Sequence, residues 1–275
     1  MQNILKTDWA GLAEFYWVQL KINLALQFQY RASMVIWLMG LVVEPVVYLV
    51  VWRTVTASEG GSVAGFTAGN FAAYYITMMI INHLTFTWIM WEYEYYIRNG
   101  TLAAMLLRPI HPIHKDISDN VAYKLLTSVV LLPIILILIW IFQPTADTTI
   151  GTTIAFIPAM LLAAAMRFMT GWTLALAAFW TTRIGAFNSA YFAAIYFFSG
   201  RMAPLELFPN FIQVIAYGLP FRWMLAFPVD LLLGKLTLQE TLIGFGAQLI
   251  WLVVCLSILN TVWRTGVRQF SAVGN

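Results

Sequence analysis

Polar side chains that interrupt long apolar segments are the first candidates for chemistry in this sequence. An ionisable group at membrane depth costs about 2.5–3.5 kcal/mol, so each such residue is a functional hypothesis by default. The residues expected to line a polar path or a subunit interface are Glu44, Asn82, His83, Asn188 and Tyr196. The alternative is a structural role, in which Glu44 is neutral or bonds His83 or Arg167. For Arg167 itself the structural role is favoured.

Motifs for enzymatic chemistry are missing from the sequence. The single cysteine, Cys255, cannot form an internal disulfide. His111 and His114 are three positions apart, but Pro112 between them disfavours a helical metal site. There is no H-E-x-x-H motif, no Ser/His dyad and no G-x-x-x-x-G-K-[ST] phosphate loop. We therefore expect no catalytic residue, no metal and no cofactor in this chain.

The composition indicates a membrane protein. Hydrophobic residues make up 61% of the 275 residues and charged residues only 10%, against about 25% in soluble domains. A soluble core of this size could not bury so many apolar side chains, and high hydrophobicity with a net charge of +3 excludes disorder. The small net charge gives no indication of a nucleic-acid partner.

Six apolar segments are long enough, or nearly so, to span a bilayer, which takes about 20 residues. Only helices and closed barrels satisfy the backbone in lipid, and these continuous runs do not alternate as barrel strands do. The expected fold is therefore all-α and polytopic, with a bend at Pro133 in the third span. The segments are 33–52, 71–91, 121–142, 152–180, 184–199 and 241–263.

An additional helix precedes these spans. Residues 8–31 are apolar but carry polar side chains throughout, and Trp9, Leu12, Tyr16 and Leu20 recur at helical spacing. This pattern predicts an amphipathic helix at the membrane interface. A seventh span is the less favoured alternative.

Basic residues predict the orientation of the chain, because cytoplasmic loops are enriched in Lys and Arg. With a cytoplasmic N-terminus, ten basic residues fall inside and four outside, so both termini are expected in the cytoplasm. The inner set is Lys6, Lys21, Arg31, Arg98, Arg108, Lys115, Lys124, Arg183, Arg264 and Arg268. The outer set is Arg53, Arg201, Arg222 and Lys235.

Two connections stand out between the spans of this single transmembrane domain, 1–275. The largest cytoplasmic connection, 92–120, reads as a charged helix, a break at Gly100 and a short helix with leucines on one face. An exposed leucine stripe requires a partner surface, whereas an ordinary solvated loop is the alternative. The largest external connection, 200–240, is apolar and broken by proline and glycine, which predicts short helices that dip into the outer leaflet.

These two connections resemble those of ABC-2 type transporter permeases. The cytoplasmic one carries the E…GTLE…LL…P pattern of that family, with Ala103 in place of a frequent glutamate. The external one resembles the conserved pattern between its last two spans at Phe198-Ser199-Gly200, Pro204, Phe208-Pro209, Ile215, Pro220-Phe221 and Gly234. Arg222 in the same connection is expected at the membrane interface, where it would snorkel or meet lipid headgroups. The form Arg98…Gly100…Leu107-Arg108-Pro109 is similar to the branch whose permeases are often encoded as pairs.

The resemblance implies a six-span permease with an interfacial helix and an external re-entrant hairpin, located in the inner membrane of a prokaryotic cell. Two permease subunits, identical or different, would pair among membrane lipids, and two ABC ATP-binding subunits would bind ATP and Mg²⁺. ATP-driven closure of those subunits would act on the cytoplasmic connection. The residues to which the resemblance gives this coupling role are Glu92, Glu94, Arg98, Gly100, Thr101, Leu102, Leu106, Leu107, Arg108 and Pro109.

The implied function is export of a hydrophobic or amphipathic small molecule, lipid or glycan by alternating access. One alternative is a proton-coupled secondary transporter that uses Glu44 and His83, although no inverted repeat is visible. A non-transporting membrane scaffold is the other alternative.

Overall fold

The computed structural model describes residues 9–29, 31–181 and 184–270, and these are almost entirely helical. The helices are α1 (Trp9–Gln29), α2 (Arg31–Ser58), α3 (Ala68–Thr85), α4 (Ile89–Arg98), α5 (Thr101–Leu106), α6 (Pro112–Phe142), α7 (Ile150–Ala175), η1 (Leu176–Phe179), α8 (Gly185–Phe198), η2 (Leu205–Leu207), α9 (Asn210–Gly218), α10 (Pro220–Met224), α11 (Ala226–Leu232) and α12 (Leu238–Gln269). Strands β1 (Ser62–Val63) and β2 (Phe66–Thr67) form a small antiparallel hairpin. The predicted all-α fold is confirmed.

Four helices in the described part of the chain are long and apolar enough to cross a membrane. They are Val35–Ser58, Pro112–Phe142, Ile150–Phe179 and Leu238–Gln269. The other two predicted spans correspond to α3 and α8, which have 18 and 14 residues. The count of six spans therefore stays a prediction, whereas the multi-pass character of the chain is established.

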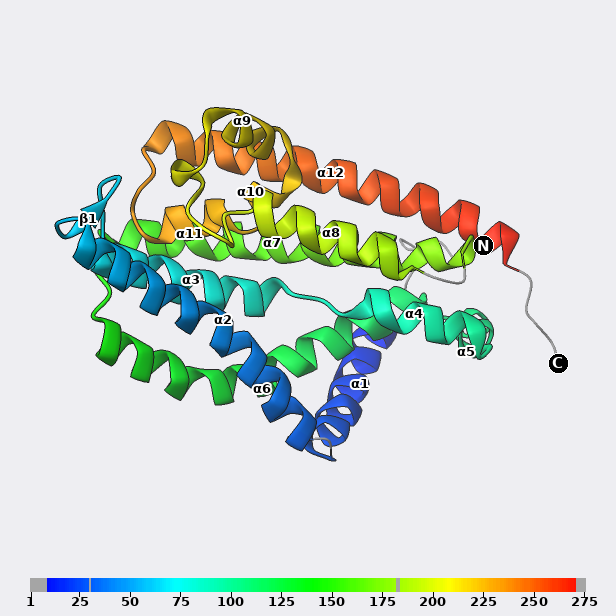
Figure 1. Cartoon of the computed structure of the whole chain (residues 1–275). Helices are drawn as coiled ribbons and strands as arrows, with labels where there is room; N and C mark the ends of the chain where they lie inside the picture. Colours follow the sequence, from blue (N-terminus) through cyan, green and yellow to red (C-terminus); the bar gives the residue numbers. More distant parts are fainter. Residues whose placement is uncertain (1–8, 30, 182–183, 271–275) are drawn as a thin grey trace.

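Two boundaries differ from the sequence prediction. The segment predicted to span 71–91 is not one helix, because α3 ends at Thr85 and α4 begins only at Ile89. Residues 112–120, expected in a cytoplasmic connection, form the first turns of the long helix α6. Pro112 starts that helix favourably since a proline at the first position loses no backbone hydrogen bond. Figure 1 shows that α6 curves along its length, and the helix continues through Pro133.

Helix α7 occupies the centre of the bundle and packs against α12, α3, α4, α10 and α11. Figure 1 shows α4, α5 and the end of α12 at one end of the molecule, with the β hairpin, α9 and the start of α12 at the other. The two ends are therefore distinct surfaces joined by the long helices. The basic residues Lys6 and Arg183, assigned above to the cytoplasmic side, lie outside the described residues.

Helix α1 packs along the beginning of α6 rather than standing alone. Its inner face carries polar groups, since Tyr16 bonds His114 and Asn23 bonds Ser118. Its outer face exposes large apolar side chains, including Trp17 and Phe28. This distribution suits a helix whose outer face contacts lipid, and its interfacial location remains a prediction.

The segment after α8 forms the short helices η2, α9, α10 and α11, and the last two pack against α7 inside the bundle. Gly200 makes the turn that leads into it. Its φ of +82° favours glycine, and a Cβ there would lie 2.5 Å from the hydroxyl of Tyr74. That hydroxyl donates to the Gly200 carbonyl oxygen over 2.7 Å.

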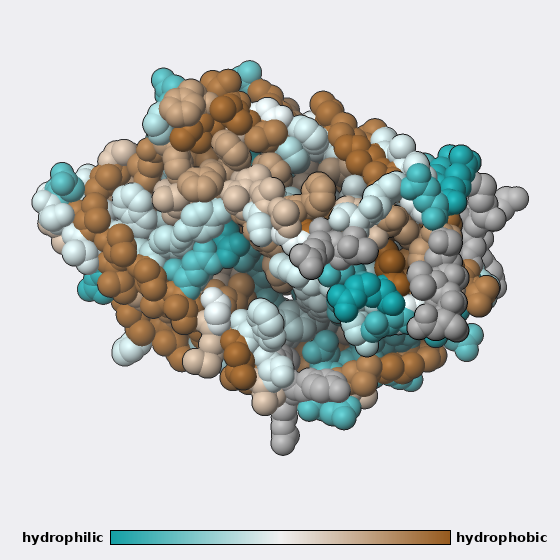
Figure 2. All heavy atoms as spheres, turned by 45° about the vertical axis from the view of Figure 1, so that its right-hand side comes forward, coloured by the Kyte–Doolittle hydropathy of each residue, from teal (hydrophilic) through white to brown (hydrophobic). Residues whose placement is uncertain are grey.

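The surface is apolar over most of the long helices. Figure 2 shows broad hydrophobic bands along them, with hydrophilic side chains gathered toward the end that carries α4 and α5. Large exposed apolar residues on α2, α6, α7 and α12 account for these bands. An apolar perimeter of this kind is stable when lipid covers it.

Candidate functional site: a charged pocket and a cytoplasmic helical element

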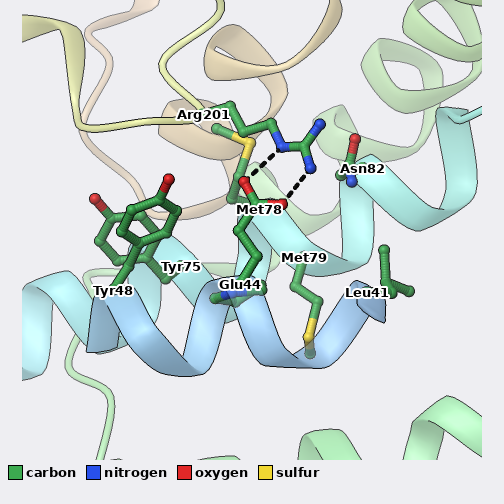
Figure 3. A pocket seen from close by; sticks show the side chains of 9 residues that line it. Leu41, Glu44, Tyr48, Tyr75, Met78, Met79, Asn82 and Arg201 are labelled. Carbon is green, nitrogen blue, oxygen red and sulfur yellow. Dashed lines mark hydrogen bonds and ion pairs between the residues drawn. The ribbon is translucent and has the colours of Figure 1, made fainter. Parts of the chain in front are cut away.

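A pocket opens between α2, α3 and the turn that follows α8. Its cavity volume is about 20 Å³, about the space for one water molecule, and Figure 3 shows the side chains that line it. The lining residues are Leu41, Glu44, Pro45, Tyr48, Tyr75, Met78, Met79, Asn82 and Arg201. The pocket therefore joins one ion pair to an otherwise aromatic and apolar wall.

The ion pair connects Glu44 of α2 with Arg201. The guanidinium donates from Nε to Oε1 over 3.1 Å and from Nη2 to Oε2, which is a bidentate arrangement. Both side chains are only partly buried, so the pair faces the open side of the pocket. The alternative in which Glu44 bonds His83 or Arg167 does not hold, because its carboxylate pairs with Arg201.

Three tyrosines form the wall beside this pair. The rings of Tyr48 and Tyr75 stack with centroids 5.1 Å apart, and the hydroxyls of Tyr48 and Tyr196 contact each other. Tyr75 also donates to the carbonyl of Met202 over 2.9 Å. These contacts connect α2 and α3 to the end of α8 and the turn beyond it. Tyr196 contacts Tyr48 but does not itself line the pocket, and its predicted role in a polar path or subunit interface stays a prediction.

Arg167 of α7 is buried, and its hydrogen bonds go to residues of α3, which suits a structural role. Its Nη1 donates to Oδ1 of Asn82 and to Oγ1 of Thr85, both over 2.8 Å. Its guanidinium carbon also lies 5.6 Å from the centre of the Phe86 ring. Asn82 thus contacts both the pocket and Arg167, and it ties α3 to α7.

His83 and Asn188 do not join the pocket. His83 is buried against α6, where its Nε2 lies 3.2 Å from Oγ1 of Thr127 and 3.4 Å from Oγ of Ser128. The side chain of Asn188 on α8 is buried without a hydrogen-bond partner among the described residues. A proton relay from Glu44 to His83 has no support, because the two residues face different helices.

The cytoplasmic element predicted from the sequence consists of α4, a turn at Gly100 and α5. Gly100 has φ +70° and precedes the first residue of α5, Thr101, so the glycine rather than the threonine is the N-cap. Glu92 accepts hydrogen bonds from Trp88 and Tyr96, each over 2.9 Å. These bonds stiffen the exposed helix α4.

The tip of this element presents a mixed surface. Glu94 and Arg98 form an i,i+4 ion pair at 3.8 Å, with Arg98 largely exposed. Leu107 is 87% exposed, and Arg108 and Pro109 next to it are also exposed. The prediction of an exposed leucine stripe was wrong for two of its residues. Leu102 is fully buried and Leu106 is partly buried, so these two anchor α5 to the bundle.

The turn and short helices after α8 are held by buried polar contacts. Ser199 is fully buried, Pro204 precedes η2, Pro209 precedes α9 and Pro220 opens α10. Arg222, assigned above to the outer set of basic residues, does not reach the surface as a residue at the membrane interface would. It is buried, 4.0 Å from Asp230, with its guanidinium 3.9 Å above the Tyr217 ring.

Sequence reasoning missed two buried carboxylates. Asp230 in α11 stands between Arg222 and Lys235, and burial raises its pKa to about 7. Its signal was available, because a single aspartate in the apolar run 226–233 must be buried or paired. Asp116 is buried at the start of α6 and binds α4 and α7. No local pattern indicated that Asp116 is buried, since the residues around it were predicted to form a loop.

A polytopic bundle of apolar helices with the α4–α5 element at one end and an ion-paired pocket is typical of a membrane transport component. Residues 42–274 match the ABC-2 family transporter proteins, which is most of the chain, and the chain belongs to that family. It is a multi-pass permease component of an ABC-type transporter, and members of this family are not themselves catalysts. No curated protein matches the chain.

Proposed function

We propose that this chain is the permease subunit of an ATP-driven exporter, and that separate ATP-binding subunits dock on α4 and α5. The observation that carries the proposal is the exposed tip of that element. Leu107 is 87% exposed beside Arg108, at the end of the molecule that also holds the end of α12. A single apolar side chain among polar neighbours suits a groove on a soluble partner.

The proposal includes a cytoplasmic location for this end and for both termini. Hydrophilic side chains gather there, as Figure 2 shows, and the exposed basic residue Arg98 lies on its surface. The proposed cell membrane is that of a prokaryote, and the proposed complex has two permease subunits and two ATP-binding subunits. The ATP-binding subunits, rather than this chain, would bind ATP and Mg²⁺.

The proposed cargo is a hydrophobic or amphipathic small molecule, lipid or glycan. Support comes from the pocket, where the Glu44–Arg201 pair stands beside stacked tyrosines and two methionines. An apolar wall with one charged pair would suit a molecule that has both an apolar body and a polar group, once movement of the spans has widened the pocket. Alternating tilts of the spans would expose this pocket to either side in turn.

The experiment is purification of the permease from its native membrane with its bound subunits, followed by measurement of ATP hydrolysis. Leu107→Asp is expected to reduce the recovery of an ATP-binding subunit, and the ATP hydrolysis that the permease stimulates, at least tenfold. Leu238→Asp is the matched control, since Leu238 is 76% exposed at the opposite end and opens α12, where an acid is tolerated. Equal recovery with both variants would contradict the docking surface.

A further inference from the structure

The first turns of α6 form hydrogen bonds to several of the helices and turns at the cytoplasmic end of the bundle. We call residues 111–120 the α6 base. It bonds α1 through His114 and Tyr16, and α4 through Asp116 and Tyr93. It also bonds the stretch between α3 and α4 through Asn120, whose amide donates to the carbonyl of Phe86.

Asp116 makes the central contacts of the α6 base. Its Oδ2 accepts from the hydroxyl of Tyr93 on α4 and from Nε1 of Trp172 on α7, each over 2.8 Å. All three side chains are buried, at 1% exposure or less. Because both donors bind the same buried oxygen, this arrangement holds α4, α6 and α7 together.

The Tyr93 hydroxyl keeps its donor role at all physiological pH values. Burial and the neighbouring Asp116 carboxyl raise its pKa well above the usual value. Removal of either donor would leave the buried Oδ2 of Asp116 with one hydrogen bond in place of two. The contact therefore resists separation of α4 from the spans.

Aromatic packing extends the contact to α12. The Trp172 ring lies 5.6 Å from Tyr93 and 5.0 Å from Trp263, and His111 lies 4.4 Å from Trp263, measured between ring centroids. Close-packed rings of this kind transmit displacement because no free volume absorbs it. A movement of α4 would thus reach α6, α7 and α12 together.

The covalent chain alone would not transmit such a movement. Helix α4 is joined to α3 through the non-helical residues 86–88 and, beyond α5, to α6 through 107–111. Both joints have free backbone dihedrals, so α4 and α5 could rotate on them as a unit while the spans stayed in place. A non-covalent connection is required if α4 is to displace the spans.

We infer that Asp116 is the positioning residue that transmits movement of α4 and α5 to α6 and α7. The inference rests on the proposed function, since it assumes that ATP-binding subunits displace α4 and α5. Asp116 itself touches neither nucleotide nor cargo. Its loss would leave docking and ATP hydrolysis in place but uncouple them from the spans.

The test uses the purified complex with its ATP-binding subunits, in a Cys255→Ala background that removes the single native cysteine. Spin labels at Glu59→Cys and Ile150→Cys report the outer ends of α2 and α7, where both residues are exposed. Electron–electron distances are compared between ADP and ATP–vanadate. ATP hydrolysis is measured on the same samples.

We expect Asp116→Leu to keep at least half of the ATP hydrolysis and to lose at least half of the nucleotide-dependent change in label distance. Asp119→Leu is the matched control, one turn along α6, because Asp119 pairs with Lys115 and Asn23 and touches neither α4 nor α7 through a hydrogen bond. The control should keep the distance change. An unchanged response in Asp116→Leu would overturn the inference.

A second pair of variants covers the case in which Asp116→Leu does not fold. Tyr93→Phe and Trp172→Phe each remove one donor and keep an aromatic ring. Their double variant is expected to lose the distance change as Asp116→Leu does, and a full response in it would overturn the inference. Failure of the proposed function is distinguishable, because no ATP-binding subunit would then purify with the native chain.

Discussion

Arg201 donates from Nε to Oε1 of Glu44 over 3.1 Å, and this bond joins the middle of α2 to the turn beyond α8 across 157 positions of sequence. The carboxylate and the guanidinium face the open side of a pocket that tyrosines and methionines complete. The ion pair therefore connects α2 to this turn, and it is the most polar part of the pocket wall.

The contribution of the Glu44–Arg201 pair to stability should depend on the two opposite charges more than on which residue carries each charge. Glu44→Gln and Arg201→Met should each lower the free energy of unfolding by about 1–3 kcal/mol, between the values for exposed and buried pairs. The exchanged double variant, Glu44→Arg with Arg201→Glu, should recover part of that loss. Thermal unfolding in detergent measures all three. If the exchanged variant is less stable than either single variant, the attraction between the two charges does not contribute to stability.

Substitution of Asn82 should lower the free energy of unfolding more than substitution of Arg167 does. Asn82→Leu leaves the buried guanidinium with Thr85 but without the other of its two acceptors at 2.8 Å, so we expect a loss of about 1.5–3 kcal/mol. Arg167→Met removes the charge together with its need for partners, and it should cost less. Denaturation curves of the two variants give the comparison. A larger loss for Arg167→Met would mean that the guanidinium contributes net stability.

Gly200→Ala should destabilise the turn that leads into the short helices. A φ of +82° costs an alanine about 1–2 kcal/mol, and its Cβ would lie 2.5 Å from the Tyr74 hydroxyl. Tyr74→Phe removes the clashing oxygen but not the backbone strain. The combination with Tyr74→Phe should therefore cost less than the sum of the two single changes, as read from thermal unfolding. Strict additivity would show that the side chains do not meet.

His111 should make stability depend on pH in the acidic range. Its Nδ1 accepts from the backbone N–H of Ile113 at the start of α6, a bond that requires an unprotonated nitrogen. Burial lowers the pKa of His111 from 6.5 to about 4. The unfolded chain then binds a proton that the folded chain refuses, so the free energy of unfolding falls as the pH drops from about 6.5 to about 4.

The His111→Asn variant isolates this contribution, because asparagine can cap the helix without titrating. The difference between the two proteins should be constant above pH 7 and should shrink or reverse below pH 6, by at most about 3 kcal/mol. Denaturant titrations at several pH values measure it. Parallel pH curves for the two proteins would contradict the assignment of the effect to His111.

The sequence predicted the two short helices and the glycine break between them, because these signals are local. Gly100 takes a left-handed conformation between two short helices, as a glycine break between helix-forming runs predicts. The same reasoning misplaced Leu102, since an apolar residue at helical spacing is equally compatible with a partner surface and with the protein's own core. Only the rotation of α5 about its axis distinguishes the two, and packing sets that rotation.

Composition and hydropathy were enough to assign the class of the protein: its scarce charge and long apolar runs require lipid, and lipid requires helices. The break at Gly100 was also predictable, because glycine tolerates the left-handed backbone between two helices, whereas Pro133 stays inside α6. The pairing of polar groups was not predictable from the sequence. Glu44 pairs with Arg201, and Asp116 pairs with Tyr93 and Trp172, since such contacts depend on the relative rotation and height of helices. Those quantities are set by the packing of the whole bundle, and no local pattern encodes them.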